Sequence, residues 1–134
     1  MNIIGGKLTK TSAEKYVDTV VQTSLGVNLV IQSVELRQKM LVLKYVYEID
    51  YKVKQGKMAM EGELHMQGSE KEMKDFEDRW KKNKQIEPAL AENIMNSIKR
   101  TGMAIGTLLA FSVGIPAPIF DWQIKVNSNA SSAG

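Results

Sequence analysis

The stretch from Leu41 to Val53 constrains the fold more than any other part of the chain, because its residues alternate between two chemical kinds. One set is apolar or aromatic and consists of Leu41, Leu43, Tyr45, Tyr47, Ile49, Tyr51 and Val53, whereas the intervening set is largely charged. A period of two residues is typical of a β-strand that buries one face. The stretch therefore predicts a half-buried strand.

A second alternating run follows a short break at Gln55 and Gly56. Its apolar face holds Met58, Met60, Gly62, Leu64 and Met66. Two such strands joined by a short turn predict a long antiparallel hairpin with one apolar and one charged face. A sheet of this kind needs helices or another subunit over its apolar face, so the pattern is typical of a partner-dependent binding domain.

The expected register of this hairpin places apolar residues opposite one another across a tight turn. The expected pairs are Val53 with Met58, Tyr51 with Met60, Ile49 with Gly62, Tyr47 with Leu64 and Tyr45 with Met66. On the charged face, this register places Asp50 beside Glu61 and Glu48 beside Glu63, and facing like charges destabilise a sheet. Two interpretations stay open: an acidic docking surface for a basic partner, or a solvated face screened by Lys44, Lys52 and Lys57.

Two more strands are expected before the hairpin, from Asn2 to Lys15 and from Asn28 to Leu36, because both stretches are rich in β-branched or apolar residues. The segment between them, Tyr16 to Gly26, fits either a short amphipathic helix or an irregular crossover. The second hairpin strand is expected from Lys57 to Gln67.

Two helices are expected after the strands. Ser69 and Glu72 match the S-x-x-E capping box, in which a hydroxyl and a carboxylate satisfy free backbone donors at a helix start. The apolar face of that first helix holds Met73, Phe76 and Trp80 at three- and four-residue spacing. A longer second helix is expected to begin at Pro88 and to end at Gly114 and Pro116. The predicted fold class is therefore α+β, with four strands followed by two helices.

Composition excludes several classes of protein. The chain has 134 residues, of which 43% are hydrophobic and 25% charged, which predicts one globular domain over residues 1–126 and a flexible polar tail over 127–134. The absence of cysteine excludes disulfides, thiolate metal sites and thiol catalysis. No secretory signal pattern begins the chain, so we expect a cytoplasmic location. The net charge of +3 is spread along the chain and is weak evidence for a polyanionic partner.

No motif or constellation points to catalysis, so we expect no enzyme activity, no cofactor and no metal site. The chain lacks the P-loop, G-x-G-x-x-G, H-E-x-x-H and G-x-S-x-G patterns. His65 is the one histidine, and a lone imidazole makes neither a zinc site nor a catalytic triad. It falls on the polar face of its strand, where we expect a surface side chain.

Three other features each have a functional and a structural interpretation. The uncharged run from Thr101 to Phe120 is long enough to span a bilayer. Its glycine and proline residues instead favour a buried helix, in which the small Gly102 and Gly106 let the helix approach the sheet or a symmetry mate. Arg79 to Lys84 could contact RNA through lysines and Trp80, or could simply end a helix. The methionines on the hairpin could serve promiscuous binding or fill gaps in a core, and we favour the core.

Several short motifs resemble the SecB family of export chaperones, and most closely its small archaeal SecB-like members. They are the Thr9-Lys10-Thr11-Ser12-Ala13-Glu14 run, Glu61-Gly62-Glu63-Leu64, Trp80-Lys81-Lys82-Asn83-Lys84 and the proline-containing Ile115-Pro116-Ala117-Pro118-Ile119. The resemblance implies a Greek-key sheet with a crossover between its first two strands, helices packed on one face, and assembly into dimers or tetramers. The positive net charge departs from the acidic bacterial SecB.

The resemblance also implies that the chain binds non-native polypeptides near the crossover and the second helix. By region, the implied client-binding residues are Tyr16, Val20, Val21, Leu25, Phe111, Ile119, Phe120 and Trp122. An acidic face for a translocation partner would use Glu48, Asp50, Glu61 and Glu63. The leading hypothesis is an ATP-independent holdase linked to protein export, and the alternative is a small RNA-binding or scaffold protein that uses Arg79 to Lys84.

Overall fold

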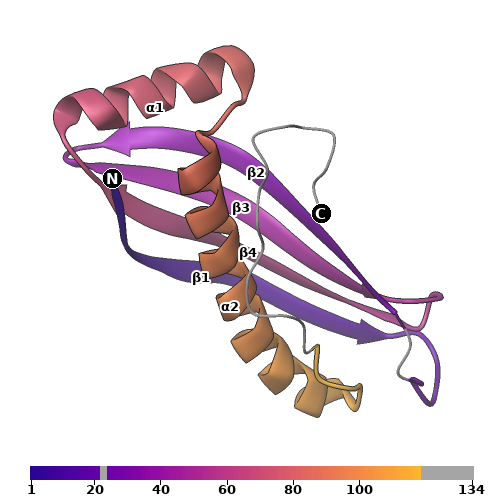
Figure 1. Ribbon diagram of the computed structural model, residues 1–134. Coiled ribbons are helices and arrows are strands. Elements are labelled where there is room, and N and C mark those ends of the chain that lie inside the picture. Colours follow the sequence, from indigo (N-terminus) through magenta and orange to yellow (C-terminus); the bar gives the residue numbers. More distant parts are fainter. Residues whose placement is uncertain (22–23, 119–134) are drawn as a thin grey trace.

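The computed structural model describes residues 1–21 and 24–118. Its elements are β1 (Asn2–Lys15), β2 (Leu25–Arg37), β3 (Met40–Tyr51), β4 (Gly56–Gln67), α1 (Glu70–Asn83) and α2 (Pro88–Val113). The four strands form one antiparallel sheet in the order β1-β4-β3-β2 (Figure 1). The predicted α+β class and order of elements are confirmed.

The sheet is a Greek key, as the resemblance implied. Strands β2, β3 and β4 follow one another as hairpins, whereas β1 lies at the far edge beside β4. The chain therefore crosses from one edge of the sheet to the other between β1 and β2. Leu25 and Gly26 already belong to β2, which begins three residues earlier than we predicted.

Helix α1 begins where the capping box placed it. The Ser69 hydroxyl accepts a hydrogen bond from the Glu72 backbone N–H at 3.1 Å, and the Ser69 N–H donates to the Glu72 carboxylate at 3.0 Å. The helix lies along the end of β2 and packs against β2 and β3 with Met73 and Trp80 buried. It also closes that end of the β2 edge, because the Leu36 N–H donates to Glu77 at 2.8 Å.

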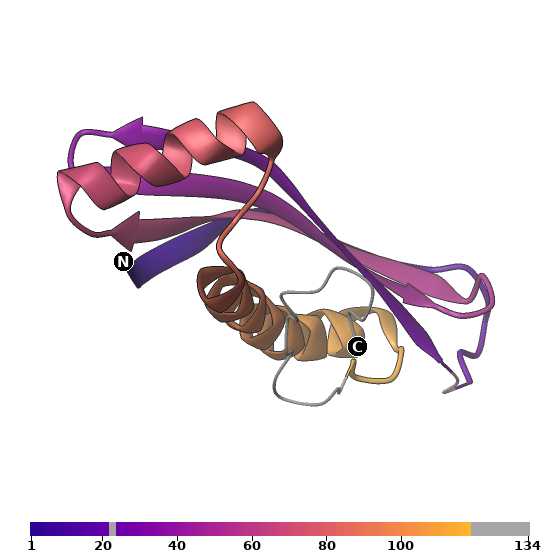
Figure 2. The same ribbon diagram turned by 45° about the horizontal axis from the view of Figure 1, so that its top comes forward.

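Helix α2 crosses one face of the sheet and packs mainly against β1 and β4 (Figure 2). It begins with Pro88 and ends at Gly114, whose φ of 73° is the left-handed conformation that glycine tolerates. Gly102 lies against the Tyr47 ring, so the small residues of α2 bring the helix close to the sheet. Within residues 1–21 and 24–118, no helix has the length and apolar character needed to cross a membrane.

The hairpin register differs from the prediction by four residues. Tyr45 lies opposite Gly62 and Ile49 opposite Met58, because the turn is formed by residues 52–55, two residues earlier than in the expected register. Val53 lies in this turn and is 82% exposed, whereas we had placed it on the buried face. A shift by an even number of residues keeps the remaining hairpin side chains on their predicted faces. The apolar face is therefore as predicted although the pairing is not.

The buried core lies between the apolar sheet face and the two helices. The predicted residues Leu41, Leu43, Tyr45, Tyr47, Ile49, Tyr51, Met58, Met60, Leu64 and Met66 are all at most 5% exposed. The hairpin methionines therefore fill the core, as we favoured. Trp80 of α1 and Ile94 and Ile98 of α2 close it from the helical side.

Two core tyrosines give a matched test of this packing. The Tyr47 hydroxyl is buried without a hydrogen-bond partner among the described residues, and burial raises its pKa to about 12. The Tyr51 hydroxyl, by contrast, donates to the Pro116 carbonyl. We expect Tyr47→Phe to raise the free energy of unfolding by about 1 kcal/mol and Tyr51→Phe to lower it by about the same amount. Urea unfolding of both variants checks this, and a destabilised Tyr47→Phe protein would contradict the packing.

Candidate functional site

One part of the apolar sheet face is left half-open beside the helices. Helix α1 packs against the end of β2 near Leu36, and α2 packs mainly against β1 and β4. Val27 lies opposite the fully buried Ile49 and so points to the core face, yet it is 46% exposed. Leu25 and Leu29 on the same strand, and Val20 in the crossover, pack against the core but are only partly buried. We call Val20, Leu25, Val27 and Leu29 the β2 flank.

Three residues of the β2 flank, Leu25, Val27 and Leu29, lie on an edge strand. Among residues 1–21 and 24–118, strand β2 pairs only with β3, so alternate backbone N–H and C=O groups of β2 point away from these strands. An edge of this kind can accept an additional extended chain, with backbone hydrogen bonds for affinity and contacts to every second side chain for specificity. The flank therefore offers an apolar surface next to an open strand edge.

At the tip of the sheet, the crossover before β2 is held by the hairpin turn, through the Lys52 N–H, which donates to the Ser24 carbonyl at 3.1 Å, and through Gln55. Its side-chain amide accepts from the Val21 N–H at 2.7 Å and donates to the Val21 carbonyl at 3.0 Å. Its own carbonyl accepts from the Tyr16 N–H at 2.9 Å. This role of Gln55 was not predicted, because Gln55 is far in the sequence from Val21 and Tyr16.

The chain returns over the core face after α2. The Pro116 carbonyl accepts the Tyr51 hydroxyl hydrogen bond, and Ile115 is 7% exposed. Pro118 is buried against Gly106 of α2. Tyr51 pairs with Leu25 across the sheet, so this returning segment lies one strand away from the β2 flank.

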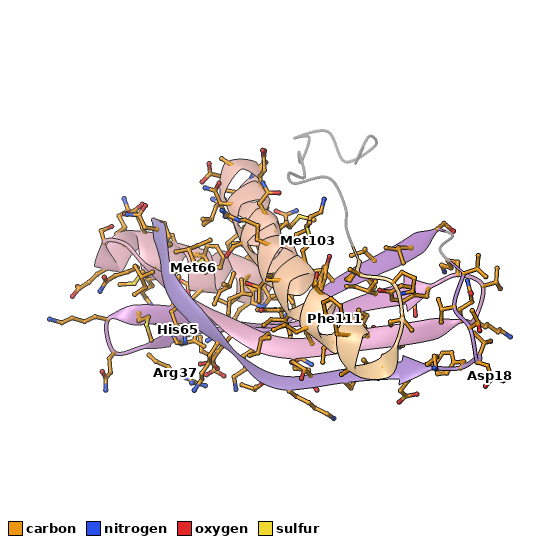
Figure 3. The ribbon with its side chains drawn as sticks, turned by 90° about the horizontal axis from the view of Figure 1, so that it is seen from below. Asp18, Arg37, His65, Met66, Met103 and Phe111 are labelled. Atoms are coloured by element: carbon orange, nitrogen blue, oxygen red, sulfur yellow. The ribbon has the colours of Figure 1, made fainter. Side chains whose placement is uncertain are left out.

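The structure separates the client-binding residues that we predicted. Val20 and Leu25 lie on the β2 flank, and Val21 is 63% exposed beside it. Phe111 is 83% exposed on α2, apart from the crossover that carries Asp18 at the tip of the sheet (Figure 3). Three other predicted residues, Ile119, Phe120 and Trp122, lie outside the described residues.

Tyr16 belongs to the opposite face of the sheet. It borders a hollow of about 270 Å³ together with Ser12, Glu14, Glu48, Lys57 and Ala59. This hollow is on the charged face, whereas Leu25 and Val27 are on the core face. Tyr16 therefore does not share one continuous surface with the β2 flank.

The predicted facing pairs of acids are wrong, because they followed from the wrong register. Asp50 lies opposite Lys57, and Glu48 makes an ion pair with the Lys57 ammonium at 2.7 Å. A hydrogen bond from Lys57 lowers the pKa of the Glu48 carboxyl and raises the pKa of Lys57. The expected clash of like charges is absent at these described residues.

The other two acids are matched by lysines of β1. Lys10 lies 3.9 Å from Glu61, and Lys7 lies 3.8 Å from Glu63. His65 lies on the polar face, as we expected, where its side chain is 24% exposed and contacts Glu63 at 2.9 Å. This hydrogen bond from His65 is the main reason that the pKa of Glu63 is lowered. The acids therefore lie in a mixed-charge face and not in an acidic patch.

The basic segment from Arg79 to Lys84 keeps its cations exposed but not its aromatic ring. Trp80 is 9% exposed and belongs to the core. Lys84 lies 5.1 Å from the centre of its ring, and Lys81 pairs with Glu77 at 3.5 Å. A buried indole cannot stack on a base, so the RNA-binding alternative loses the feature that motivated it.

Together, the β1-β4-β3-β2 sheet, the edge-to-edge crossover and the two C-terminal helices define a SecB-like α+β fold. Among solved structures, the chain is similar to the Mycobacterium tuberculosis Rv1957 SecB-like chaperone in complex with a ChAD peptide from the Rv1956 HigA1 antitoxin. The TM-score is 0.61 at 10% sequence identity, and the match covers 90% of this chain and 86% of the other. No protein-family model matches the chain, and no curated protein does.

Proposed function

We propose that the protein is an ATP-independent holdase that binds extended, apolar segments of non-native polypeptides along the β2 flank. The observation that carries this proposal is Val27, an apolar side chain that is 46% exposed on the core face of an edge strand. An extended client would lie beside β2 and place every second side chain on the flank. No covalent chemistry is needed for this activity.

The similar solved structure supports the proposed class of ligand. That Mycobacterium tuberculosis protein of the same fold is a chaperone in complex with a peptide. For our chain, we take from it the class of ligand, an extended polypeptide, and we take the position of binding from the β2 flank. The exposed Val21 extends the proposed surface toward the crossover, and the exposed Phe111 of α2 would be a separate apolar contact.

The finer parts of the proposal concern the setting in which the protein acts. We propose a cytoplasmic homo-oligomer related to the archaeal SecB-like group, with a link to protein export. A translocation partner that docked on the charged face would meet Glu48, Glu61 and Glu63 already paired with lysines. Such a partner would need charges of both signs, because an excess of positive charge would meet lysines as well as acids.

Aggregation of a chemically denatured client, followed by light scattering, tests the proposal. We expect a stoichiometric amount of the protein to suppress the scattering, equally with and without ATP. A polypeptide that stays unfolded by itself should compete and restore the scattering. Unchanged aggregation in the presence of excess protein would contradict the proposed function.

A further inference from the structure

The chain beyond the described residues carries the pattern of an extended client. From Phe120 to Val126, apolar residues alternate with polar ones. The apolar set is Phe120, Trp122, Ile124 and Val126, and the polar set is Asp121, Gln123 and Lys125. A period of two residues presents all four apolar side chains on one side of an extended chain. We call residues 120–126 the alternating segment.

The described part of the chain passes within one strand of the β2 flank at Pro116, two residues before it ends. Pro116 is held on Tyr51 by a hydrogen bond, and Tyr51 pairs with Leu25, the first strand residue of the flank. Pro118 lies buried against Gly106 on the same face of the sheet. Neighbouring strands are about 4.8 Å apart and an extended residue spans about 3.3 Å. The alternating segment therefore begins within reach of the flank and is long enough to run along it.

The flank has the chemistry that this segment needs. Val27 leaves about half of its side-chain surface open on the core face, and Val20, Leu25 and Leu29 are partly buried beside it. The edge of β2 can pair with an extended backbone at the same place. Burial of an aromatic side chain on such a surface favours docking within one chain.

We propose that the alternating segment occupies the β2 flank as an internal competitor of clients. This inference rests on the proposed function, because it gives the client site a second occupant from the same chain. Clients then bind only to the fraction of molecules in which the segment has left the flank. A segment that is docked about nine-tenths of the time weakens apparent client affinity about tenfold.

Two neighbouring substitutions in the full chain test the competition. Ile124→Asp puts a carboxylate on the apolar side of the segment, whereas Gln123→Asp puts the same charge on its polar side. We expect Ile124→Asp to bind a fluorescently labelled, permanently unfolded polypeptide about tenfold more tightly than wild type. Gln123→Asp should bind it with unchanged affinity. Unchanged affinity in Ile124→Asp would overturn the inference. Weaker affinity would also overturn it, because the segment would then be part of the client site.

Trp122 reports the position of the segment directly. The protein has two tryptophans, so subtracting the emission of Trp122→Phe from that of wild type isolates Trp122 without disturbing the buried Trp80. We expect blue-shifted emission that is protected from iodide, and a red shift with loss of protection when client is added. A Trp122 signal that is solvent-exposed without client, or that client does not change, would also overturn the inference. Client binding measured in the same titration keeps this outcome separate from failure of the holdase proposal itself.

Discussion

Replacement of Gly102 with leucine is expected to lower the free energy of unfolding by about 3 kcal/mol or more. A Cβ atom at Gly102 would lie 2.5 Å from Cε2 and 2.9 Å from Cδ2 of the Tyr47 ring. Tyr47 is 3% exposed in the centre of the sheet, and its strand is paired on both sides. Neither the ring nor the helix can move away without opening the core, because interiors are close-packed.

The matched control for this substitution is Ala104→Leu. Ala104 lies two residues further along α2 and is exposed, and leucine is nearly as good a helix former as alanine. We expect this control to change the unfolding free energy by less than about 0.5 kcal/mol. Guanidinium unfolding followed by circular dichroism measures both variants. Equal stability of the two would mean that α2 does not lie against the sheet at Gly102.

The faces of the sheet could be predicted from sequence, but its register could not. Alternation of apolar and polar residues fixes which side of a strand each residue occupies, and it leaves every even-numbered shift equally acceptable. Tyr45 was placed on the correct face and opposite the wrong partner for this reason. The turn decides the register, and here it is a four-residue turn in which Lys54 adopts a positive φ of 51°. The turn contains no Asn-Gly or Asp-Gly pair that would have indicated its position.

The helix ends were predictable because their signals are local. The Ser69 capping box, Pro88 at the start of α2 and Gly114 at its end each act within one turn of the helix. The crossover was not predictable to the same degree, because its backbone is held by the distant Gln55. The ion pairs that join Lys7 and Lys10 to β4 could not be predicted either, since they require the β1–β4 pairing.

The candidate site was predicted only by region. Leu25 and Val20 were included, but Val27 was missed although its signal is present in the sequence. Val27, Leu29 and Ile31 alternate with polar or less buried residues, and the pattern then changes phase, because a bulge at Gln32 moves the next buried residue to Val34. A bulge interrupts the period of two residues, which hides the face of an edge strand.

The β2 flank makes a strong prediction about client binding, since two valines on one strand differ mainly in the face they occupy. Val27 is 46% exposed on the core face, and Val30 is 47% exposed on the charged face. Val27→Asp would place a carboxylate against the apolar side chains of a bound client. Client binding would then remove water from this carboxylate, which is energetically unfavourable. We expect at least about tenfold weaker binding, which corresponds to about 1.4 kcal/mol. Val30→Asp should bind clients as wild type does.

Affinity of these two variants for a labelled, permanently unfolded polypeptide, measured by fluorescence anisotropy, tests the central claim most directly. Both substitutions are at half-exposed positions, so both proteins should fold, and matching circular dichroism spectra and unfolding midpoints would show that they do. If clients bind along the β2 flank, Val27→Asp alone loses affinity. Equal affinity in the two variants, or a loss confined to Val30→Asp, would contradict client binding along the β2 flank.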